Sequence, residues 1–200
     1  HSNTAVGESS LTTNTSGVRN VAVGQNAMAV NTTGGENIGI GRGALDANTT
    51  ASRNVAVGDS ALGANTTAAS NTAIGWSALA ANTTGTGGTA VGAASLDAVT
   101  TGDYNTGVGF TSGSKVTTGT RNVALGAFAL QEATTGNDNT YVGYAAGAAT
   151  TTASNNTAVG KSAMAANTTG SGDVAIGHNS LASNTEGSQQ VAVGKDSMYS

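Results

Sequence analysis

The chain repeats itself every 17 residues without an insertion or a deletion, and this period is what most restricts its fold. In each period one glycine follows a large aliphatic residue. These glycines are Gly7, Gly24, Gly41, Gly58, Gly75, Gly92, Gly109, Gly126, Gly143, Gly160, Gly177 and Gly194. A register kept this strictly predicts coils stacked on one another, because one inserted residue would break the pairing between neighbours.

The composition alone would suggest disorder. Only 9% of the residues are charged and 4% are aromatic, proline is absent, and there are 30 glycines. A chain with so few large apolar side chains cannot offset its conformational entropy with an ordinary core. We therefore expect its order to come from repetition.

The three residues that directly precede each repeat glycine show the period-two pattern of a β-strand. An aliphatic or threonine residue, a small residue and a second aliphatic residue follow one another, as in Thr72, Ala73 and Ile74. Both faces of such a strand are apolar, so both should be covered. We expect one face to fill the coil and the alanine face, exposed in a monomer, to contact other chains.

A second apolar position, filled mainly by Leu or Met, lies four residues after each repeat glycine, as at Leu62 and Leu79. We expect a short second strand or a bend there. The Asn-Thr-Thr-Gly that often follows is typical of a turn.

Two polar residue types recur at fixed positions and predict hydrogen-bonded ladders along the stack. Asn opens most of the strands, as at Asn54 and Asn71. Threonine fills another position of every period without exception. Its members in the middle of the chain are Thr32, Thr49, Thr66, Thr83, Thr100, Thr117, Thr134, Thr151 and Thr168.

These motifs resemble those of a known group of proteins. NTAIGWSALAANTTGTG (71–87) and NTAVGKSAMAANTTGSG (156–172) are similar to the 17-residue repeats of phage tail-fibre-like proteins. The N-x-V-A-I-G half also resembles the head domains of trimeric autotransporter adhesins. The resemblance implies an all-β, left-handed parallel β-roll of twelve coils, wound as an intertwined or side-by-side homotrimer. Residues 1–200 would be a single repetitive domain, a fragment of a longer extracellular fibre on a virion or cell.

The sequence lacks the patterns typical of several other functions. There is no cysteine for a thiolate metal site, and the seven Lys and Arg residues are scattered, which argues against nucleic-acid binding. No apolar run approaches the roughly 20 residues of a membrane-spanning helix. No pair of titratable residues has a catalytic or metal-binding spacing. We expect no enzymatic activity, no cofactor, no metal and no membrane insertion.

The residue that directly follows the repeat glycine varies most, which predicts that it points outward. Trp76, Phe110, Tyr144 and His178 occupy this position, and we expect them to contact a glycan or protein receptor.

The pattern is least regular between residues 99 and 152. Gly113 and Gly147 replace the Leu of the second apolar position. An aromatic residue (Phe110, Phe128, Tyr141 or Tyr144) is expected to fill the resulting space.

The sequence favours a non-enzymatic structural and adhesive fibre segment that forms a rigid trimeric rod for surface or host attachment. An alternative is an ice-binding solenoid that uses the threonine ladder Thr32 to Thr168 as its ice face. A weaker alternative is a self-assembling extracellular filament.

Overall fold

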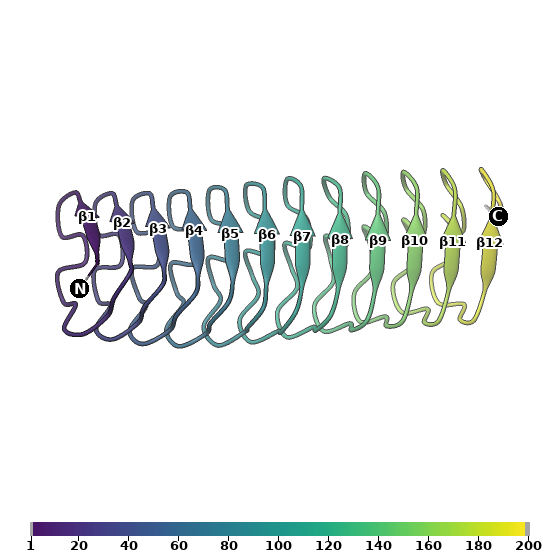
Figure 1. The fold of residues 1–200 in the computed structure, drawn as a ribbon. Coiled ribbons are helices and arrows are strands. Elements are labelled where there is room, and N and C mark those ends of the chain that lie inside the picture. The colour runs from purple at the N-terminus through teal and green to yellow at the C-terminus, as the bar shows by residue number, and fades with distance from the viewer. Residues whose placement is uncertain (1, 199–200) are drawn as a thin grey trace.

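In a computed structural model that describes residues 2–198, the chain forms a β-solenoid of stacked parallel strands (Figure 1). Each strand has three residues, and the strands follow one another in chain order. They are β1 (Thr4–Val6), β2 (Val21–Val23), β3 (Ile38–Ile40), β4 (Val55–Val57), β5 (Thr72–Ile74), β6 (Thr89–Val91), β7 (Thr106–Val108), β8 (Val123–Leu125), β9 (Thr140–Val142), β10 (Thr157–Val159), β11 (Val174–Ile176) and β12 (Val191–Val193). The predicted all-β tandem-repeat solenoid is confirmed.

Each strand pairs in register with the same three positions of the next coil. Thr72 lies opposite Thr89, and Ala73 lies opposite Ala90. The same 17-residue offset holds for all neighbouring strands from β1 to β12. With about 4.8 Å between strands, the twelve strands span about 53 Å, which gives the straight rod in Figure 1.

The interior of the coil is filled by the small strand residue and by the Leu or Met of the opposite wall. Ala73 is 0% exposed and Leu79 is 1% exposed. The expectation that the alanine face points outward is therefore wrong. The coil is too narrow for a large side chain from both walls, so a Leu on one wall requires an Ala on the other.

The Leu and Met residues of the core lie in turns, not in a second strand. Their backbone is in the left-handed region, with φ of 50° at Leu62, 49° at Leu79 and 52° at Met164. This region is least accessible to β-branched residues. The position accordingly holds Leu, Met or Gly in every coil.

Buried asparagines connect successive coils through their side chains, as the sequence predicts. The Asn71 amide donates from Nδ2 to the Gly85 carbonyl at 2.9 Å, and its Oδ1 accepts from the Gly88 N–H at 2.7 Å. A second ladder lies at the corner, where Asn48 Nδ2 donates to Asn31 Oδ1 at 2.8 Å. These bonds satisfy polar groups that would otherwise be costly to bury.

Tyr141 fills the space left by Gly147, which confirms one of the expected replacements. The Tyr141 ring is fully buried, and a Cβ added to Gly147 would lie only 2.2 Å from it. Thr150 donates its hydroxyl proton to the Tyr141 hydroxyl at 3.1 Å. Phe110 and Tyr144 are exposed instead, so they do not fill the core.

We expect Gly75→Ala to destabilise the fold strongly. Gly75 has a φ of 138°, and an added Cβ would lie 2.5 Å from the Gly92 carbonyl oxygen of the next coil. Backbone strain of this kind costs about 1–3 kcal/mol before the steric clash is added. Thermal unfolding followed by circular dichroism measures the loss.

Gly63→Ala is the matched control, because the same position of the next coil already carries Ala80. The control should change the unfolding temperature much less. Equal stability of the Gly75→Ala variant and the wild type would contradict the packing described above.

Candidate functional site

The outer face of the twelve-stranded sheet carries no charged side chain, and threonine supplies its only polar groups. The first residue of each strand, which is Val, Ile or Thr, forms the first column of this face. The third residue, which is aliphatic in every coil, forms the second column. Ile74, in the second column, is 41% exposed. From the strand dimensions the face covers roughly 500 Å², which is at the upper end for a patch on a monomeric protein. We call it the outer sheet face.

A second surface feature borders this face, at the position directly after each repeat glycine. Trp76 is 60% exposed, and Phe110 and Tyr144 are each 53% exposed. The His178 side chain is 42% exposed. These four residues occupy the same position on alternate coils, and we call them the ring row. Their exposure agrees with the variability of this position in the sequence.

Phe128 contacts two members of the ring row from the coil between them. Its ring centroid lies 5.6 Å from that of Phe110 and 5.6 Å from that of Tyr144. The interplanar angles of 83° and 80° are those of edge-to-face pairs, a favourable arrangement of aromatic rings. Phe128 therefore restrains both neighbours. The sequence indicates this only indirectly, by placing a large aromatic where neighbouring coils carry small residues.

The threonine ladder from Thr32 to Thr168 stabilises the stack. Thr32 donates its hydroxyl proton to the Thr49 carbonyl at 3.0 Å, and Thr83 donates to the Thr100 carbonyl at 3.0 Å. The threonine that directly follows each of these ladder residues is exposed. Within residues 2–198 the hydroxyls of this second column have no hydrogen-bond partner in the protein. Its members are Thr33, Thr50, Thr67, Thr84, Thr101, Thr118, Thr135, Thr152 and Thr169.

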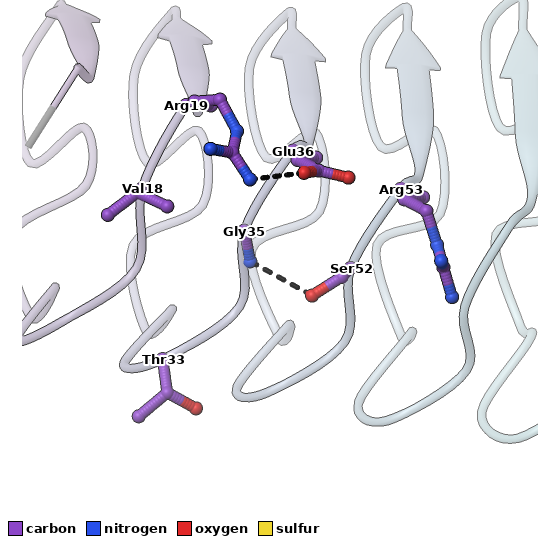
Figure 2. A pocket seen from close by; sticks show the side chains of 7 residues that line it. All are labelled: Val18, Arg19, Thr33, Gly35, Glu36, Ser52 and Arg53. Carbon is purple, nitrogen blue, oxygen red and sulfur yellow. Dashed lines mark hydrogen bonds and ion pairs between the residues drawn. The ribbon is translucent and has the colours of Figure 1, made fainter.

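A shallow depression of about 400 Å³ lies at the corner of the second to fourth coils (Figure 2). Arg19 reaches along the rod to form an ion pair with Glu36, and the Gly35 N–H donates to Ser52 Oγ at 3.0 Å. The residues that line the depression are Val18, Arg19, Thr33, Gly35, Glu36, Ser52 and Arg53. Similar ion pairs join adjacent coils elsewhere, as between Arg121 and Asp138, so the pairing here is part of the stacking.

Within residues 2–198, no three His, Asp or Glu side chains come together in a way that could hold a metal ion. Burial raises the pKa of Asp46 and of Asp97, but these two carboxyl groups lie three coils apart. In the same part of the chain there is no helix of the length and apolarity that crossing a membrane requires.

No family model, curated protein or solved structure matches this chain. Its function must therefore be inferred from its own surfaces. The outer sheet face, the ring row and the exposed threonine column from Thr33 to Thr169 are surface features that the stacking of the coils leaves available.

Asp173 takes the place of an asparagine in the first buried ladder. Its N–H donates to Asn156 Oδ1 at 2.8 Å, and its Oδ1 accepts from the Gln190 N–H at 2.8 Å. Its Oδ2 is buried without a partner, whereas Asn156 in the preceding coil places an amide there that donates to the Gly170 carbonyl. Burial raises the pKa of Asp173 for this reason.

We expect Asp173→Asn to stabilise the protein at neutral pH by about 1–2 kcal/mol, because it supplies the missing donor. The raised pKa means that the folded state holds the proton more tightly than the unfolded state. The contribution of Asp173 to stability is therefore fully present below the pKa that this residue has in the unfolded chain. It is lost as the pH rises through the pKa that Asp173 has in the folded protein. Unfolding curves at pH 3 and pH 7 should show the gain at pH 7 and little difference at pH 3.

Asp138→Asn is the matched control for this comparison. Hydrogen bonding to Arg121 lowers the pKa of Asp138, so the control should not stabilise the protein at pH 7. If the stabilities of the wild type and the Asp173→Asn variant differ by the same amount at both pH values, the pH-dependent role assigned to Asp173 would be contradicted.

Proposed function

We propose that this chain is a non-enzymatic segment of an extracellular fibre that attaches a virion or cell to a surface. In this proposal three copies pack through their outer sheet faces and form a rigid rod. The resemblance of the repeats to tail-fibre and adhesin-head sequences supports the biological setting. The exposed apolar outer sheet face is the observation that carries the proposal.

Within residues 2–198 no segment covers the outer sheet face, so the face is free to contact a partner. The interior is already filled by the Ala and Leu side chains, and the coils use their corners for the Asn and Thr ladders. An uncharged strip about 53 Å long is the kind of surface that self-association buries. Burial of such a strip would rigidify the rod along its whole length.

Three copies around one axis can cover the whole width of the face. The strip is only three residues wide and presents two outward columns, represented in β5 by Thr72 and Ile74. Around a threefold axis, the first column of one copy can contact the second column of the next copy. Such a contact is heterologous and closes into a ring, so no apolar column stays exposed.

Ice binding is a second candidate function, favoured by the exposed threonine column from Thr33 to Thr169. Its hydroxyls repeat at the strand spacing and have no partner among residues 2–198 of the protein. The ladder from Thr32 to Thr168, in contrast, donates its hydroxyl protons to the next coil. Faceted crystals in an ice-shaping assay would favour this function.

Light scattering of the purified chain tests the trimer. We expect a mass of three times the 19.1 kDa of one chain. The double variant Val91→Lys, Val108→Lys places two charges on the outer sheet face and should have the mass of one chain, because each buried lysine would be unpaired.

The control is Thr84→Lys with Thr101→Lys, which adds the same charges to the same coils on the exposed corner. It should keep the mass of the trimer. A wild type that scatters as a monomer would overturn the proposal, whether or not the lysine variants fold.

A further inference from the structure

The ring row has a period of two coils. Trp76, Phe110, Tyr144 and His178 lie on every second coil, and the coils between them carry Ala93, Ala127 and Lys161. Two strand spacings separate neighbouring members, which is about 9.6 Å. The three aromatic residues thus recur at regular intervals along about 19 Å of the rod.

The rings are accessible and partly fixed before any ligand arrives. More than half of the surface of Trp76, Phe110 and Tyr144 is exposed. Phe128 holds Phe110 and Tyr144 through its two edge-to-face contacts. Restrained side chains lose less conformational entropy when they bind, so this arrangement favours recognition.

We propose that the ring row binds a linear β-1,4-linked polysaccharide, with Trp76, Phe110 and Tyr144 stacking on every second sugar. An extended β-1,4 chain presents the same face of its sugars once per disaccharide, and the length of that disaccharide matches two strand spacings. The C–H face of a pyranose is apolar and fits an aromatic face. The inference rests on the proposed adhesive function, because it names the surface that the fibre would bind.

The row fits a polysaccharide better than a second copy of this chain. A flat protein face would leave a gap above Ala93, between Trp76 and Phe110, whereas a ligand with the same two-coil period needs contacts only at the rings. Polar groups lie at both ends of the aromatic part, with Asp59 one coil before Trp76 and Lys161 one coil after Tyr144. These groups can hydrogen-bond to sugar hydroxyls.

Trp76 is the only tryptophan of the chain, so its fluorescence reports binding at the row directly. We expect cellohexaose or chitohexaose to change this emission in a saturable way, and maltohexaose, which is α-linked and helical, to leave it unchanged. Phe110→Ala and Tyr144→Ala should each weaken binding about fivefold or more. Tyr104→Ala is the control: Tyr104 is equally exposed but lies outside the row, so affinity should not change.

A variant with a shifted ring tests the spacing itself. Ala93→Phe combined with Phe110→Ala keeps the number of aromatics but reduces the first gap from two coils to one. We expect it to bind as weakly as Phe110→Ala, with circular dichroism confirming that each variant is folded. Wild-type affinity of the shifted variant, equal binding of maltohexaose, or no response to either β-linked sugar would overturn the inference. A trimeric mass together with any of these results would leave the proposed fibre in place.

Discussion

Hydrogen bonding between identical positions of successive coils is the constraint on which the rest of the structure depends. The Gly75 N–H donates to the Val57 carbonyl of the previous coil at 2.8 Å, and the Thr72 N–H donates to the Gly88 carbonyl of the next coil at 2.8 Å. The Asn and Thr side chains add bonds of the same kind. Because every coil is bonded to the next at equivalent atoms, an insertion in one coil would disrupt its neighbours. This explains why the period has no exception.

The narrow coil determines which residues face the solvent. Leu79 and its equivalents occupy the interior from one wall, so only Ala or another small residue fits opposite them. The larger Val, Ile and Thr side chains of the strands are consequently left outside. A chain with so few large apolar residues therefore exposes many of them. This connects the packing of one coil to the proposed association of three chains, and the repeat also fixes the spacing of the ring row.

Much of the fold can be predicted from the sequence, because the period identifies the strand, the turn and the polar ladders. The sequence does not show which face of the strand points into the coil, because the residues of both faces are largely apolar. The choice depends on the size of the Leu or Met side chain that packs against the strand from the opposite wall. The sequence also does not distinguish the two adjacent threonines of each coil. In the structure the Thr32 hydroxyl donates to the next coil, whereas Thr33 is exposed. The ring row was predicted as exposed, but the contacts of Phe128 depend on ring orientations that the sequence does not specify.

Distances between spin labels test the stacked coils most directly. Labels at Asp59→Cys and Lys161→Cys lie at the same position six coils apart, and the chain is diluted with unlabelled protein so that only distances within one copy are measured. Stacked coils should give a narrow distribution near 29 Å, and one about 9.6 Å shorter when the second label is moved two coils closer, to Ala127→Cys. A broad distribution, or a distance that does not shorten with the number of coils, would contradict it.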